Sequence, residues 1–149
     1  MNDGNEAQAR AEAARDAMFA GDRVAQTMGM AVEKVGPGSA TVTMTVRPDM
    51  CNGLDVCHGG LIFSLADAAM AFACNALGGS HLASDASIDW LAPGRIGDRL
   101  EATATETTRR GRTGLYHVEV VGPDGVVAVF RGKTKMVSDD GPAPAPKTT

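Results

Sequence analysis

One aspartate stands alone in a long apolar segment, and its position is the strongest chemical signal in the chain. Between Gly59 and Leu77 the residues read GGLIFSLADAAMAFACNAL, in which Asp67 is the only charged side chain. A helix that is apolar on nearly every face is buried. A buried carboxylate is costly unless paired, and such groups cluster at active sites. Asp67 is therefore predicted to be catalytic; the alternative is a structural aspartate at a wet subunit seam or bonded to a neighbouring backbone.

A pair of glycines opens the same segment. Gly59 and Gly60 let another molecule approach the backbone closely. The first N–H groups of a helix are also unpaired and lie at the positive end of its dipole. The pair therefore predicts a site for an anion or an oxyanion. The alternative is that the two glycines only turn the chain into the helix.

Two polar side chains precede this helix. His58 either orients a substrate or caps the helix, and Asn52 lies in a loop that can fold back over the same helix end. The Asn52 amide is predicted to hold a substrate or an attacking water. Its alternative role is an Asn-Gly turn with Gly53.

Helix geometry separates the two strongest signals. Asp67 follows Gly59 by eight residues, which at about 1.5 Å per residue places them roughly 12 Å apart along one helix axis. One chain cannot easily bring both residues to one carbonyl group. If Gly59 holds the oxyanion, we expect the carboxylate to come from a two-fold-related helix, so that each site of a dimer takes Gly59 from one chain and Asp67 from the other.

Charge and cysteine content exclude several classes of protein. The formal net charge is -4, with 14 Lys and Arg against 18 Asp and Glu, so no global basic field exists to hold nucleic acid or an anionic membrane. The three cysteines are odd in number and match no zinc spacing, so we expect neither a disulfide scaffold nor a metal site. No cofactor is expected. Residues 1–15 lack the apolar run of a signal peptide, which favours a cytoplasmic protein.

Helix formers and turn residues divide the rest of the chain into elements. Ala, Glu and Arg favour a helix over 5–20 that Gly21 ends, and Asp22 can cap a second helix over 23–28. Alternating residues predict a hairpin over 30–35 and 39–46, before the long helix between His58 and Gly78. Four strand-like segments then predict an antiparallel meander: 84–91, 99–108, 115–121 and 126–136.

This order of elements predicts an α+β fold in which one helix packs on one antiparallel sheet. A membrane span is disfavoured because an aspartate is costly at its centre. We expect a single domain over 1–137, with N-terminal helices within 1–29. The tail over 138–149 carries three prolines, has nothing to bury and is expected to be disordered.

Several motifs along the chain match the signature of a known family. The helix motif consists of Asn52-Gly53, Cys57-His58-Gly59-Gly60, Leu65-Ala66-Asp67 and Ala73-Cys74-Asn75. The strand motifs are Ser87-Ile88-Asp89-Trp90-Leu91 with Pro93-Gly94, Gly97-Asp98-Arg99-Leu100 and Val129-Phe130-Arg131-Gly132-Lys133. Over roughly 22–136 the chain thus resembles the PaaI-type (phenylacetic acid degradation) hotdog-fold thioesterases. The helix motif is fairly specific for this branch, whereas the strand motifs recur in many hotdog proteins.

The resemblance implies a hotdog fold, with a six-stranded antiparallel sheet around a long helix, and a homodimer that commonly doubles to a homotetramer. It implies hydrolysis of acyl-coenzyme A thioesters, with phenylacetyl or hydroxyphenylacetyl groups as the acyl class. The Gly59 N–H would polarise the thioester carbonyl, and Asp67 would act as nucleophile or general base. Asn52, His58 and Gly60 would position substrate or water. Ala92 departs from the pattern, since relatives often carry a basic residue there.

The coenzyme A phosphates need basic partners. The densest basic cluster is Arg109-Arg110-Gly111-Arg112, and Lys133 is next, so Arg109, Arg112 and Lys133 are the predicted contacts. An ordinary solvated turn is the alternative. Two competing functions remain: a non-catalytic acyl-CoA sensor, which would not need Asp67, and a hotdog hydratase or dehydratase, which would need a histidine paired with a carboxylate.

Overall fold

The computed structural model describes residues 3–142, which contain three α-helices and six strands. A short 3-10 turn over Pro48–Met50 leads into the loop before the third helix. In chain order the elements are α1 (Asp3–Gly21), α2 (Arg23–Thr27), β1 (Ala31–Gly36), β2 (Ser39–Thr45), α3 (Gly59–Asn75), β3 (Ser80–Trp90), β4 (Arg99–Arg110), β5 (Thr113–Gly122) and β6 (Gly125–Ser138).

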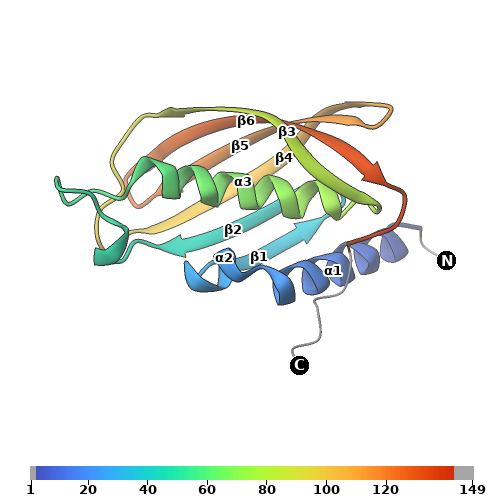
Figure 1. Ribbon diagram of the computed structural model, residues 1–149, viewed down its shortest axis with the longest axis horizontal. Helices are drawn as coiled ribbons and strands as arrows, with labels where there is room; N and C mark the ends of the chain where they lie inside the picture. Colours follow the sequence, from blue (N-terminus) through green and yellow to red (C-terminus); the bar gives the residue numbers. More distant parts are fainter. Residues whose placement is uncertain (1–2, 143–149) are drawn as a thin grey trace.

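The strands form one antiparallel sheet in the order β1-β2-β4-β5-β6-β3, and this sheet curves around α3 (Figure 1). The green helix α3 lies along the concave face, and the blue helices α1 and α2 lie beside β1 at one edge. The predicted hotdog architecture, a long helix wrapped by six strands, is confirmed.

The predicted meander is wrong for one strand. β4, β5 and β6 follow each other across the sheet, but β3 pairs with β6, where Ile88 lies opposite Phe130. The other edge of β4 is occupied by β2, whose Val42 lies opposite Ala102. Strand propensity is a local property and does not distinguish these pairings. β3 therefore ends the sheet, and within residues 3–142 its outer edge has no partner strand.

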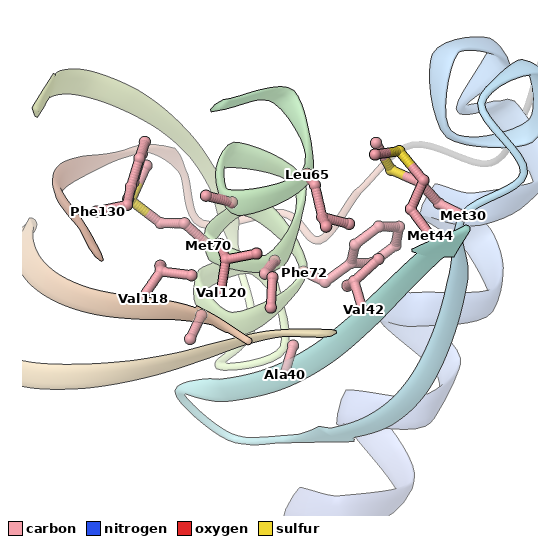
Figure 2. Packing of buried hydrophobic residues seen from close by; sticks show 14 of the residues in the cluster. Met30, Ala40, Val42, Met44, Leu65, Met70, Phe72, Val118, Val120 and Phe130 are labelled. Atoms are coloured by element: carbon pink, nitrogen blue, oxygen red, sulfur yellow. The ribbon is translucent and has the colours of Figure 1, made fainter. Parts of the chain in front are cut away.

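The core lies between α3 and the concave face of the sheet (Figure 2). Leu65, Met70 and Phe72 of α3 pack towards strand residues such as Val42 and Phe130, and each of these side chains is at most 1% exposed. Such burial stabilises by about 25 cal/mol per Å² of apolar surface, so it holds α3 on the sheet along its length. Among the described residues, no helix is both long enough and apolar enough to span a membrane.

The N-terminal helices are fixed by polar contacts. The Asp22 carboxylate accepts a hydrogen bond from the Ala25 N–H at 2.9 Å, so the predicted cap of the second helix is confirmed. From α1, Gln8 Nε2 donates to the Val35 carbonyl of β1 at 2.7 Å. This contact places α1 along the strand that forms the second edge of the sheet.

The first residues of the predicted tail belong to the fold. β6 continues through Ser138, Arg112 pairs with Asp139 at 3.2 Å, and Ser80 Oγ donates to the Asp140 carbonyl at 2.8 Å. The prediction of disorder is therefore wrong for 138–140, because cross-strand polar contacts replace the missing apolar burial. Residues 143–149 lie outside the described part of the chain.

Candidate active site

A small antiparallel ladder positions the start of α3. The Cys57 N–H donates to the Gly94 carbonyl at 2.7 Å, and the His58 N–H donates to the Met50 carbonyl at 2.8 Å. The residues just before the helix are thus tied to two other loops. These bonds fix the direction in which the first turn of α3 points.

The first turn of α3 begins at Gly59. His58 is the N-cap, but its side chain makes no capping hydrogen bond and is exposed. The N–H groups of Gly59 and Gly60 belong to the first turn, where a helix supplies no acceptor. Gly60 is exposed and Gly59 is half-buried. The backbone donors and residue His58 therefore lie at one helix end.

The indole of Trp90 lies against Gly59. Trp90 Nε1 donates to the Gly59 carbonyl at 3.1 Å, and a Cβ built at position 59 would lie 3.1 Å from Trp90 Cε2. Any side chain at position 59 would crowd this ring, which explains the glycine by close approach rather than by turn geometry. No pattern in the sequence predicts this contact. The one signal was that the single tryptophan of the chain stands at a strand end, three residues before Pro93.

Asn52 builds a turn with its side-chain oxygen. Its Oδ1 accepts hydrogen bonds from the N–H groups of Leu54, at 2.9 Å, and Val56, at 3.4 Å. Within this turn Asp55 has a left-handed backbone, with φ of 57°. The Asn52 side-chain oxygen therefore has the alternative role, that of a turn residue. Only the Nδ2 donor is left for a substrate or a water.

Asp67 lies half-buried on α3. Burial raises the pKa of Asp67 above its ordinary value, and the negative charge of Asp22 raises that pKa further. No hydrogen bond or basic side chain contributes to the shift. A carboxyl whose pKa moves towards neutrality is suited to general acid-base work. Within one chain Asp67 is eight residues from Gly59 on the same helix, so the structure does not bring the two together.

The basic side chains of the predicted cluster do not lie together at the start of α3. Arg109 Nε lies 3.5 Å from Glu106 Oε2, and the charge of Arg109 acts on the thiol of Cys74, near the last turn of the helix. Arg112 pairs with Asp139 at 3.2 Å. Both arginines are therefore engaged in ion pairs of the protomer itself.

Lys133 has a different setting. It lies on β6, is exposed, and lines a groove of about 440 Å³ together with Arg131 and His117. The neighbouring residue Gly132 is buried, so Lys133 projects from the other face of the sheet, away from α3. The groove carries basic side chains and also the carboxylate of Asp85.

Comparisons with known proteins agree with this fold and this helix end. Residues 54–129 match the family model described as thioesterase superfamily. The chain belongs to the thioesterase superfamily. It is 44% identical to the acyl-coenzyme A thioesterase PaaI of Escherichia coli, over 81% of this chain and 87% of that protein.

Solved structures point to the same branch of the superfamily. The structure of the E. coli PaaI protein from the phenylacetic acid degradation operon has a TM-score of 0.86 and 42% identity, and covers 88% of this chain and 96% of that chain. A variant of the phenylacetic acid degradation protein PaaI from Thermus thermophilus has a TM-score of 0.75 and 35% identity, and covers 78% and 100%. The predicted resemblance to the PaaI-type hotdog thioesterases is confirmed.

Proposed function

We propose that the chain hydrolyses acyl-coenzyme A thioesters to the free acid and coenzyme A. The observation that carries this proposal is the combination, on one helix, of glycine N–H donors at its start and a half-buried carboxylate with a raised pKa. Thioester hydrolysis needs donors for the developing oxyanion and a base or nucleophile at about 3 Å. Similarity to the E. coli acyl-coenzyme A thioesterase supports coenzyme A as the leaving thiol.

In the proposed mechanism, the Gly59 N–H donates to the thioester oxygen and stabilises the negative charge that develops there. Asp67 either attacks the carbonyl carbon, forming an anhydride that water cleaves, or removes a proton from the attacking water. In the first route the carbon–sulfur bond breaks as the anhydride forms, and the thiolate takes its proton from water. In the second route the bond breaks when the tetrahedral intermediate collapses, and the thiolate takes the proton that Asp67 removed from the attacking water. The His58 imidazole, the Gly60 N–H and Asn52 Nδ2 orient the substrate and the water.

The active site is proposed to form between two chains. About 12 Å of helix separates Gly59 from Asp67 in one protomer, so a two-fold-related α3 must supply the second group. The edge strand β3 supports such a dimer, because unpaired strand edges favour pairing. Large apolar side chains along and just beyond β3 are also exposed, namely Leu82 at 64%, Trp90 at 52% and Leu91 at 63%. We also propose that two such dimers associate into a homotetramer.

The nucleotide end of coenzyme A is proposed to meet Lys133. Lys133 lines the groove and makes no ion pair among the described residues. Arg109, Arg112 and the groove residue Arg131 each already face a carboxylate, namely Glu106, Asp139 and Asp89. Basic groups pair well with phosphate oxygens. Arg109 and Arg112 remain weaker candidates.

Phenylacetyl and hydroxyphenylacetyl groups are the proposed acyl class, supported by the similarity to PaaI proteins of phenylacetic acid degradation. A cytoplasmic location stays a prediction.

A substrate panel tests the function. Release of free thiol is measured with phenylacetyl-, hydroxyphenylacetyl-, short and long fatty acyl-coenzyme A, and each is compared by kcat/KM. We expect turnover with the arylacetyl thioesters to exceed that with the fatty thioesters. Binding without thiol release would instead identify a sensor, and reaction of enoyl or hydroxyacyl thioesters without loss of the thioester would identify a hydratase.

A further inference from the structure

Cys51 and Cys57 face each other across the ladder that leads into α3. They form an isolated antiparallel bridge, and all three cysteines of the chain are free thiols. Two backbone hydrogen bonds flank the pair instead of joining it, from Asn52 N–H to Val56 O at 2.9 Å and from His58 N–H to Met50 O at 2.8 Å. Cys51 and Cys57 are therefore a non-hydrogen-bonded pair, the closer of the two antiparallel pairings, with Cα atoms typically about 4.5 Å apart.

This pairing meets the requirements of a disulfide. Directly opposed residues of an antiparallel pair project their side chains to the same face. A disulfide spans Cα atoms roughly 4.4–6.8 Å apart, so the typical spacing of this pair lies within the allowed range, at its short end. The two thiols also influence each other, because the charge of Cys51 adds to burial in raising the pKa of Cys57 to about 11.

The surroundings restrict Cys57 to this one partner. A Cβ built at Gly94 would lie 3.3 Å from Cys57 Cβ, so backbone closes one side of the residue. Cys57 is 4% exposed, whereas Cys51 is only half-buried. The third cysteine, Cys74, is 1% exposed inside α3, where its Sγ donates to the Ala71 carbonyl at 3.4 Å. Cys51 is thus the thiol that a reagent reaches first.

We propose that Cys51 and Cys57 are a redox modification site that takes a small-molecule disulfide as its oxidant and lowers turnover when it closes. The Cys51 thiolate attacks one sulfur of the oxidant and expels the first thiolate, leaving a mixed disulfide. The Cys57 thiolate then attacks Cys51 Sγ and expels the second. The two cysteine protons end on the two released thiols, and the pair has lost two electrons to the oxidant.

Closure acts on the candidate active site through the chain itself. The disulfide ring encloses the turn built by Asn52, and Cys57 is followed directly by His58 and Gly59. A disulfide prefers a Cα separation of about 5.5–6 Å, which is wider than the typical spacing of this pair. Closure therefore spreads the two strands slightly and shifts the backbone that aims the Gly59 N–H. A displacement of about 1 Å in a catalytic group can cost on the order of a hundredfold in rate. This activity effect rests on the proposed thioesterase function, whereas the disulfide itself does not.

Peptide mapping tests the modification. Reduced full-length protein is treated with oxidised glutathione, its remaining thiols are alkylated, and the chain is cleaved before aspartates, which places the three cysteines in the separate peptides 49–54, 55–66 and 67–84. We expect peptides 49–54 and 55–66 to be joined, with 67–84 alkylated. The C57S variant should stop at a glutathione adduct on Cys51, and the matched control C74A should close like the wild type. A lasting adduct on wild-type Cys51, a bond to Cys74 or a link between chains would overturn the proposal.

Turnover is measured on the same samples. Closed wild-type and C74A proteins should lose at least about tenfold in kcat and recover it on reduction, whereas C51S should keep its rate under the same treatment. Full closure with unchanged kcat would overturn the regulatory effect. An inactive reduced protein would instead contradict the thioesterase function and leave the mapped disulfide standing, so the two failures are distinguishable.

Discussion

At the scale of single residues, the candidate for a chemical role is Asp67, a carboxylate in an apolar helix. The half-buried carboxylate has a raised pKa because of burial and Asp22. D67N keeps the shape and removes the charge, so we expect kcat to fall by at least about a hundredfold. In the wild type, the acid limb of the kcat/KM profile should lie above the ordinary aspartate pKa of about 3.9. Near wild-type rates in folded D67N would make Asp67 a structural residue.

The same substitution should affect stability in a direction that the pKa fixes. The folded-state pKa of Asp67 is raised, so its contribution to stability is present at low pH and lost as pH rises through that pKa. D67N should therefore be more stable than the wild type at neutral pH, and the difference should shrink below about pH 4. Denaturant unfolding at several pH values measures it. A D67N protein that is less stable at neutral pH would contradict this sign.

Trp90 is expected to act as a positioning residue through Gly59. W90F keeps an aromatic ring but loses the N–H that bonds the Gly59 carbonyl at 3.1 Å. A hydrogen bond of this kind contributes about 1 kcal/mol, so kcat should fall by roughly fivefold with little change in KM. W90A also removes the packing on Gly59 and should lose more. Equal losses in both variants, or a change confined to KM, would argue against positioning.

Lys133 can be tested against its neighbour on the same strand. K133A should raise KM for coenzyme A thioesters by several-fold, because an ion pair of an exposed side chain contributes up to about 1 kcal/mol. The KM for a short pantetheine thioester, which lacks the nucleotide, should stay unchanged. Lys135 is also exposed on β6 but does not line the groove, so K135A is the matched control. A parallel rise in KM for both thioesters would remove Lys133 from the nucleotide site.

At the scale of elements, the contact between α3 and β6 depends on one glycine. A Cβ at Gly132 would collide with Met70 Sδ and would lie 2.9 Å from Phe130 Cε1. Overpacking of this kind destabilises by about 1–3 kcal/mol, which we expect for G132A. M70A alone should cost about 2–5 kcal/mol through its cavity. Combined, the new methyl group fills part of that cavity, so the two changes should be less destabilising than their sum.

Denaturant unfolding at one fixed protein concentration measures these three variants, because an oligomer would make stability concentration-dependent. A coupling energy of at least about 0.5 kcal/mol is expected between residues in contact. Strict additivity would mean that Met70 moves away from β6 at little cost.

Local sequence patterns predicted the helices and strands. They did not predict features that depend on contacts between these elements. Helix formers, Asp22 and the strand alternation located α1, α2 and the strands because each signal is local. The start of β3 at Ser80 and its pairing with β6 depend on the whole sheet. Asp67 and Gly59 could be proposed as site residues because they are chemically unusual for their segment. Trp90 could not be proposed in this way, because its role depends on a contact with Gly59 that exists only in the folded chain.

At the scale of the whole molecule, the separation of Gly59 from Asp67 predicts complementation between chains. D67A and G59P each remove one component, and each alone should be nearly inactive. Unfolded together in equal amounts and refolded, about half the dimers should be mixed, with one intact site of two, so about a quarter of wild-type activity should return. No recovery in dimers shown to be mixed would refute a shared site.

The proline of G59P also crowds Trp90. The folding of this variant must therefore be checked before the complementation result is interpreted. A Cβ at position 59 lies 3.1 Å from the indole, close enough that the ring must shift slightly. Circular dichroism of each parent, and the oligomeric state of the refolded mixture, provide that check. Refolded wild-type protein is the reference for recovered activity.

The packing of Trp90 on Gly59 has an optical consequence. Trp90 is the only tryptophan of the chain and is 52% exposed, so nearly all ultraviolet-excited emission at long wavelength comes from the start of α3. A thioester that settles on this helix end must change the polarity around that single indole. Substrate arrival can therefore be followed in unlabelled protein by stopped-flow emission. Its rate can then be compared with that of thiol release in the same solution.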